Sequence, residues 1–351
     1  MNFKKLHFTS AMIGVFAYCH DTFAMNFANH ALIPATPVET VSQPAVSQPE
    51  AQQITQSQPI DSKWNNSLDM TVINQASKQI NRQISSSITN HITENFIGSR
   101  TEEDGFKPDD VWTNFSWSTL TNQTKKLDDF NTDIYQSAIG IDKKIGDFYI
   151  GGTFVYAASN ANFPNSINDV KHTVNITPYA AYEIDDNFFL SALSGYLYTG
   201  AVATSSTESD TQANISEIDL NSFHIVENWF MRGKLGGRYY HSDTEMNNQQ
   251  LSQNKSYNSN TWTFLTDISG GFKFDDELKV FTGVLYELNN QSNLNNSQTK
   301  LQLNDGNAFY YNAGIDYLVS KEFSLGANLQ TDLSNSTVDL TTVGLNMRLE
   351  M

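Results

Sequence analysis

The segment Leu278–Leu288 reads LKVFTGVLYEL, and its pattern decides the fold. Every second residue, counted from Leu278, is apolar or a threonine, whereas the charged residues Lys279 and Glu287 fall on the other face. A period of two residues is that of a β-strand, whose successive side chains point to opposite faces of the sheet. The segment therefore predicts a strand with one apolar face.

The same alternation recurs from residue 111 to the end of the chain, and it predicts twelve strands. They are expected at 111–120, 133–142, 147–158, 171–183, 187–199, 214–228, 229–242, 258–274, 277–290, 306–320, 322–332 and 336–351. Tight turns are expected at 143–147, 184–187, 275–277 and 320–322, and longer polar connections at 121–132, 158–170, 199–213, 243–257 and 289–305. Long and short links alternate, as in membrane barrels that have short turns at one end and long loops at the other.

The composition agrees with a barrel that crosses a membrane by strands. Mean hydropathy is -0.41, and no apolar run of 18 residues follows residue 24, so a membrane-spanning helix is not expected. Barrel strands face lipid on one side only and therefore look hydrophilic on average. The formal charge of -17 excludes binding to nucleic acid phosphates, which requires clustered Lys and Arg. We predict an all-β fold, a transmembrane antiparallel up-and-down β-barrel of 12 strands, over residues 109–351.

The N-terminus reads as a secretory signal peptide over residues 1–24. Lys4 and Lys5 precede an apolar run from Leu6 to Cys19, and small residues then allow cleavage after Ala24. Cleavage there would remove the single cysteine, so no disulfide framework is expected in the exported chain.

Residues 25–63 have the composition of a disordered linker or a short passenger. They are rich in Pro, Gln and Ser, and they repeat VSQPA at 41–45 as VSQPE at 46–50. Phe27 is their only aromatic residue, so the segment has too little apolar surface to form a core.

Residues 64–108 are predicted to hold a polar helix, at 66–97, and a connection. Apolar residues recur at every fourth position of this segment. They are Leu68, Val72, Ala76, Ile80, Ile84, Ile88, Ile92 and Phe96. Four residues advance a helix by about 400°, so this stripe winds around the helix instead of forming one flat face. Such a helix fits the polar lumen of a barrel, where the stripe would meet the polar wall on several sides. A coiled-coil stalk is the alternative.

Taken together, these features resemble the translocator domain of autotransporters, a family of secreted bacterial proteins. The resemblance covers residues 66–351 and rests on a polar helix followed by twelve alternating strands, with the last strand at the chain end. It implies an integral outer-membrane protein of a Gram-negative bacterium that translocates or displays its N-terminal segment, with a helix-plugged lumen. Outer-membrane lipid, lipopolysaccharide, periplasmic chaperones and the barrel-assembly machinery are the implied partners.

The closing segment is similar to the insertion signal that the barrel-assembly machinery reads in this family. Its apolar positions are Val343, Leu345, Met347, Leu349 and Met351. Met351 stands where the family usually has Phe or Trp.

Two other functions stay open at this point: a porin-like channel for small polar solutes, and a surface adhesin or receptor that acts through the long loops. An extracellular ligand cannot be named. No catalytic, cofactor or metal site is expected, because the histidines do not fall at metal-ligand spacing and no Gly-x-Ser-x-Gly sequence occurs. His241 and Asp243 lie near each other on one strand, a pairing that barrel proteases use, and we expect them to be solvated surface groups.

Overall fold

The computed structural model describes one helix and twelve strands. The residues it describes are 62–99, 110–122, 131–162, 169–201, 207–248, 253–275, 277–292, 307–320, 322–334 and 338–350. The elements are α2 (Ser62–Ser99), β1 (Asp110–Asn122), β2 (Asn131–Ile145), β3 (Phe148–Asn162), β4 (Asp169–Asp185), β5 (Phe188–Ala201), β6 (Thr207–Val226), β7 (Trp229–Asn248), β8 (Gln253–Lys273), β9 (Leu278–Ser292), β10 (Ala308–Ser320), β11 (Phe323–Asp332) and β12 (Val338–Glu350).

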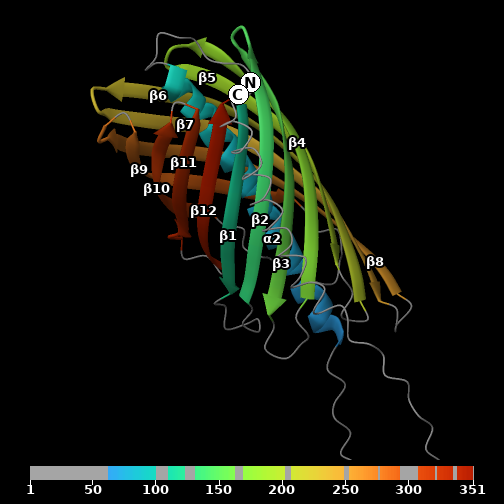
Figure 1. Cartoon of the computed structure of the whole chain (residues 1–351). Coiled ribbons are helices and arrows are strands. Elements are labelled where there is room, and N and C mark those ends of the chain that lie inside the picture. Colours follow the sequence, from blue (N-terminus) through green and yellow to red (C-terminus); the bar gives the residue numbers. More distant parts are fainter. Residues whose placement is uncertain are drawn as a thin grey trace, which may run out of the picture. The chain divides into compact units, whose positions relative to one another are not determined.

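The strands form a closed antiparallel barrel in which each strand pairs with its neighbours in the chain (Figure 1). The first and last strands close it, from Asp110 opposite Glu350 to Asn122 opposite Val338. Closure leaves no strand edge unpaired, which is the condition for a sheet to cross a bilayer. The predicted twelve-stranded barrel is confirmed.

Short turns join the strands at one end of the barrel. Two of the two-residue turns begin at residues with positive φ, Gly146 (62°) and Glu227 (55°). Elsewhere the turn begins with an aspartate: Asp185 and Asp275 each accept hydrogen bonds from backbone N–H groups two and three residues ahead. The strand ends that flank the other connections lie at the opposite end, as predicted, although the links between Ala201 and Thr207 and between Asn248 and Gln253 are shorter than expected.

The strands β1 to β9 are each longer than the sequence predicted, and the three longest are β6, β7 and β8. β6, β7 and β8 have 20, 20 and 21 residues and extend into the segments 199–213 and 243–257, which were expected to be connections. The extra length is held by polar pairs across the strands, such as the Thr211 and Thr244 hydroxyls at 2.9 Å. Both faces of these strand extensions are polar, so their sequence was interpreted as that of a polar loop.

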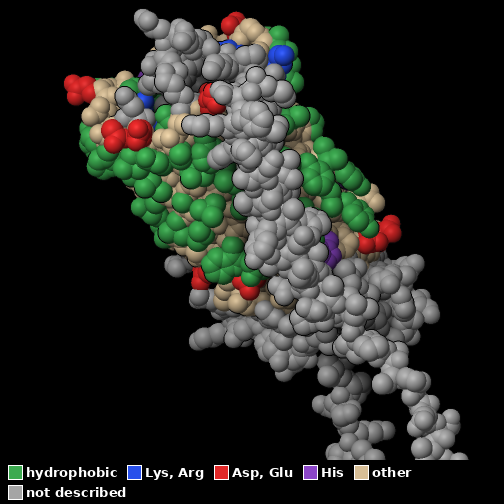
Figure 2. All heavy atoms as spheres, in the orientation of Figure 1, with side chains coloured by type: hydrophobic (Ala, Val, Ile, Leu, Met, Phe, Trp, Pro, Cys, Tyr) green, Lys and Arg blue, Asp and Glu red, His purple; other side chains and the backbone are tan. Residues whose placement is uncertain are grey.

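The outer face of the wall is apolar. In Figure 2, hydrophobic side chains cover the middle of the visible wall, and Asp and Glu lie towards its ends. The most exposed of these large side chains include Ile141, Ile176, Ile218, Trp229, Met231 and Trp262, each at least 59% exposed. An apolar outer band of this kind indicates a barrel that spans a membrane. No helix in the described part of the chain is both long and apolar enough to cross one.

The helix α2 lies inside the barrel and runs along it (Figure 1). Near its middle, the Gln79 amide donates to Thr342 Oγ1 at 3.0 Å, on the side of the barrel where β1 and β12 reach their long-connection ends. Near its end, His91 contacts Asp142, next to the tight turn that follows β2. The N-terminus of α2 therefore points to the end with long connections, and its C-terminus to the end with short turns. The predicted lumen helix is confirmed.

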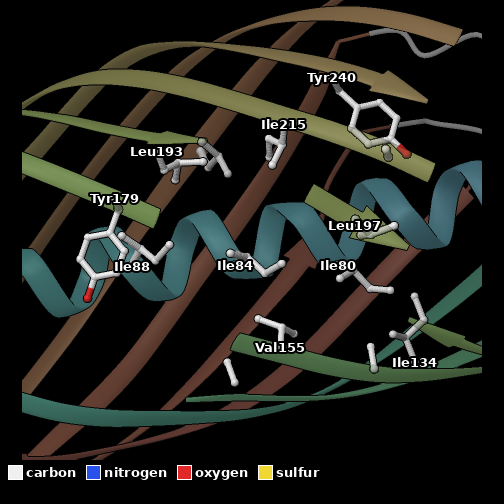
Figure 3. Packing of buried hydrophobic residues seen from close by; sticks show 14 of the residues in the cluster. Ile80, Ile84, Ile88, Ile134, Val155, Tyr179, Leu193, Leu197, Ile215 and Tyr240 are labelled. Atoms are coloured by element: carbon white, nitrogen blue, oxygen red, sulfur yellow. The ribbon is translucent and has the colours of Figure 1, made fainter. Parts of the chain in front are cut away.

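The main hydrophobic core lies between α2 and the lumen face of the wall, and most of its wall residues belong to β1 to β7. Ile80, Ile84 and Ile88 pack against wall residues both above and below the helix in Figure 3. The labelled apolar wall residues are Ile134, Val155, Tyr179, Leu193, Leu197, Ile215 and Tyr240. The expectation that the stripe meets a polar wall was wrong. The lumen-facing positions of β2 to β7 carry apolar side chains where the stripe passes. A curved wall faces more than one side of the helix, so it can contact a stripe that winds around the helix, which a flat sheet could not do as completely.

Candidate functional site

The polar side of α2 is bound to the wall by a bidentate ion pair. Arg82 Nε and Nη2 donate to the two carboxylate oxygens of Glu287, on β9, at 2.9 and 2.7 Å. The two side chains are 13% and 1% exposed. The Arg82 guanidinium also lies over the Tyr310 ring, 4.5 Å from its centroid. Two parallel charge-assisted bonds fix the orientation of Arg82, as well as its position.

Glu287 belongs to a larger charge network in the wall. Arg238, on β7, donates to Glu287 at 3.2 Å and to Glu217, on β6, at 2.5 Å. Glu217 also accepts from Lys234 at 3.0 Å and from Ser85 of α2 at 2.6 Å. The lumen charge network, meaning Arg82, Glu287, Arg238, Glu217, Lys234 and Asp219, thus has three cations and three anions. It holds α2 at two points, Arg82 and Ser85.

Sequence reasoning missed this network. It put Glu287 on the polar face of a strand, but it did not connect Glu217, Arg238 and Glu287, which all lie within strands and face the lumen, with one another or with the helix. The sequence did contain a signal, the alternation of side chains along β6. Glu217 and Asp219 alternate with Ile218 and Leu220, which are 61% and 42% exposed on the outer face. A charged residue whose neighbours face lipid must itself face the lumen.

Space remains on the side of α2 opposite the apolar core. A polar cavity of about 80 Å³ lies between α2 and the lumen faces of β6 to β11. Cations of the wall, Arg232, Lys234 and Arg238, line it together with Asp267 and several Asn and Ser side chains. The helix thus has apolar contacts mainly with β1 to β7, and the charge network and the polar space lie on its side toward β6 to β11.

A second polar contact lies near the C-terminal end of α2. His91 Nε2 and Asp142 Oδ2, on β2, are 2.5 Å apart, and the Tyr179 hydroxyl donates to the same oxygen at 2.6 Å. Trp112 donates its indole N–H to Tyr179 at 3.0 Å, and its ring stacks on His91 with centroids 5.2 Å apart. Gly140, opposite Trp112 in the β1–β2 pairing, leaves room for it, since a Cβ there would lie 2.1 Å from the indole.

The structure places the predicted helix residues in two groups. Ala76, Ile80, Ile84, Ile88 and Ile92 are buried, each at most 5% exposed. Leu68, Val72 and Phe96 lie within α2, but their side chains are outside the described residues.

At the C-terminal end, Val343 and Leu345 are exposed on the outer face of β12, at 41% and 54%, and Met347 and Leu349 are half-buried. Met351 lies outside the described residues, as do Ala24 and all of residues 1–61.

His241 and Asp243 lie on the outer face of β7, and their side chains are 26% and 51% exposed. The His241 Nε2 is 3.0 Å from Asp243 Oδ2, and its Nδ1 is 2.6 Å from the side-chain oxygen of Asn260. This pair is outside the lumen and apart from the helix contacts.

No protein-family model matches the sequence, and no curated protein matches it significantly. Solved structures do match. The translocator domain of the autotransporter NalP from Neisseria meningitidis superposes with a TM-score of 0.60 at 12% identity, over 78% of this chain and 98% of that one. The β domain of the Bordetella autotransporter Brka superposes with a TM-score of 0.54 at 11% identity, over 70% of this chain and 100% of that one. The fold is that of the autotransporter translocator barrels.

Proposed function

We propose that this protein is an outer-membrane translocator of autotransporter type, which carries the segment ahead of α2 to the cell surface of a Gram-negative bacterium and displays it there. The observation that supports this most directly is the direction of α2. Its N-terminus points to the long-connection end of the barrel, which faces outward in outer-membrane barrels. The chain ahead of Ser62 would then leave the lumen on the outside.

The helix contacts support the same proposal. In this proposal α2 is the part of the chain that stays in the lumen. There it packs against apolar wall residues and is bound to the wall at Arg82 and Ser85. The passenger in this proposal is the linker segment predicted at 25–63, without its last two residues, which belong to α2. It is short, so the display of this segment, and not the release of a large domain, is the expected result.

Epitope tags test the proposal on whole cells. A tag inserted after Gln52 should be reached by antibody on intact cells, as should tags at Asn165 and Asn295, which lie in the long connections. The matched control is a tag at Asp185, in the turn after β4. It should be labelled only after the outer membrane has been opened.

Labelling of the Gln52 tag only in opened cells, with Asn165 and Asn295 labelled from outside, would contradict translocation while it leaves the barrel orientation intact. Labelling of Asp185 alone would invert the whole topology.

A porin-like channel for small polar solutes is the second candidate, and the polar cavity beside α2 favours it. The two functions differ in what the helix does to the pore. If α2 is a plug, the full chain in planar bilayers should conduct weakly, and a chain that begins at Asp109 should conduct severalfold more. Equal and large conductance of both chains would favour the channel.

A further inference from the structure

Three metal-ligating side chains meet beside the C-terminal half of α2. His91 lies on α2, Asp110 at the start of β1 and Asp142 near the end of β2. All three are buried, and one ligand atom from each lies within 4.8 Å of the other two. We propose that this cluster, the His91 site, binds a divalent transition-metal ion of the zinc type.

The charge of the two aspartates favours a cation at this place. Asp110 and Asp142 are directly opposite each other in the β1–β2 pairing and are 1% and 6% exposed. Like charges opposite one another on neighbouring strands destabilise a sheet, and burial makes each charge more costly. A divalent cation bound by both carboxylates would offset this repulsion. Arg348, the nearby cation on β12, pairs with Glu350, and its charge also acts on Asp142.

Asp142 is arranged like a metal ligand with an outer hydrogen-bond shell. Its side chain is 1% exposed, and its Oδ1 has no hydrogen-bond partner. Its Oδ2 accepts from Tyr179, whose hydroxyl in turn accepts from Trp112. Donors of this kind orient metal-ligating carboxylates. Gly151 makes the arrangement possible, because a Cβ there would lie 2.4 Å from the Tyr179 ring.

A small space lies next to His91. This cavity of about 20 Å³ is lined by His91, Trp112, Asn114, Glu94 and Arg348 among others, though not by the two aspartates. That volume holds about one water molecule. One imidazole nitrogen, two carboxylate oxygens and one water complete the tetrahedral set that zinc prefers. In a tetrahedral zinc site with bonds of about 2.0–2.1 Å, neighbouring ligand atoms are about 3.3 Å apart. His91 Nε2 and Asp142 Oδ2 are now 2.5 Å apart, and small rotations of the two side chains would bring them to that separation.

A bound ion would join α2 to β1 and β2 at the short-turn end of the lumen. It would add a third fixed point to those at Arg82 and Ser85, whether the barrel translocates or conducts. Because the ligands come from three elements, the ion would bind the folded chain better than the unfolded one and stabilise it.

Zinc binding to the full exported chain, folded in detergent micelles and freed of metal with a chelator, tests the site. Titration calorimetry should give one Zn²⁺ per chain, with binding at least about tenfold weaker in His91→Gln and in Asp142→Asn. His241→Gln is the matched control, because His241 and Asp243 form a similar pair on the outer face, and it should bind as the original chain does. Heat-modifiable mobility on SDS gels shows that each variant has folded.

A spectroscopic measurement places the ion. Trp112 stacks on His91, so Co²⁺ bound at the His91 site should quench its fluorescence, and Trp112→Phe should lose that part of the quenching. Saturable Zn²⁺ binding that is equal in the original chain, His91→Gln and Asp142→Asn would overturn the proposal. So would the absence of any saturable binding to the folded original chain.

Discussion

Glu287 is the residue through which one carboxylate binds both the helix and the wall. Its buried carboxylate accepts from Arg82 of the helix and Arg238 of the wall. Glu287→Gln would take from Arg82 the buried carboxylate that it binds, whereas Arg238 would keep its contact with Glu217. Loss of one partner of a buried ion pair typically costs about 3–5 kcal/mol. We expect a decrease in unfolding free energy of this order, measured by urea titration of the protein folded in lipid vesicles.

Two controls accompany this measurement. Lys144 and Glu183 form an ion pair at 2.8 Å with side chains 23% and 26% exposed, so Glu183→Gln should cost only about 0–1 kcal/mol. In the double variant Arg82→Met with Glu287→Met, both charges are removed together, and the loss should be smaller than for Glu287→Gln alone. A double variant as unstable as the sum of its single changes would mean that Arg82 and Glu287 do not interact.

At the scale of the elements, β12 closes the barrel against β1 and carries the C-terminal apolar positions. Leu349 is opposite Val111 on one side and Phe323 on the other, so removal of Leu349 to Met351 shortens both pairings at the seam. We expect the shortened chain to be degraded in the periplasm, whereas Met351→Phe should insert at least as well as the original chain. Cell fractionation with immunoblotting measures both. Normal insertion of the shortened chain would refute the predicted role of this segment.

The strands could be predicted because one side of each must face lipid. β9 keeps its apolar residues at alternate positions from Leu278 to Leu288 and was placed within two residues at each end. The ends of β6 to β8 could not be placed, because beyond the membrane both faces become polar and period two no longer appears in hydropathy. Residues such as Thr211 and Thr244 serve strands and loops equally well.

The helix could also be predicted, but its contacts could not. The four-residue period gave its position to within about four residues at the start, and the buried isoleucines are those of the stripe. The partners of Arg82 and His91 depend on the depth at which the helix rests in the barrel. Nothing local in the sequence of α2 specifies that depth, because it results from the fit of the whole stripe to five or six strands.

For the whole molecule, the closed hydrogen-bond circuit predicts resistance to detergent. Every described strand is paired on both sides, so SDS has no edge from which to open the sheet. The unheated exported protein should therefore migrate faster on SDS gels than the boiled protein. Equal mobility, together with recovery in the soluble periplasmic fraction, would be incompatible with the membrane barrel.

The unequal strand lengths have a consequence for the mouth of the barrel. β11 has 10 residues, about the number needed to cross a bilayer, whereas β8 has 21. The pairing of β8 with β9 stops at Asn260, while β7 and β8 stay paired as far as Gln253. At about 3.3 Å per residue, these seven residues extend the β7–β8 hairpin some 23 Å beyond the end of the β8–β9 pairing. The described strands therefore end in a slanted rim, whose highest part is the β-ribbon formed by β7 and β8.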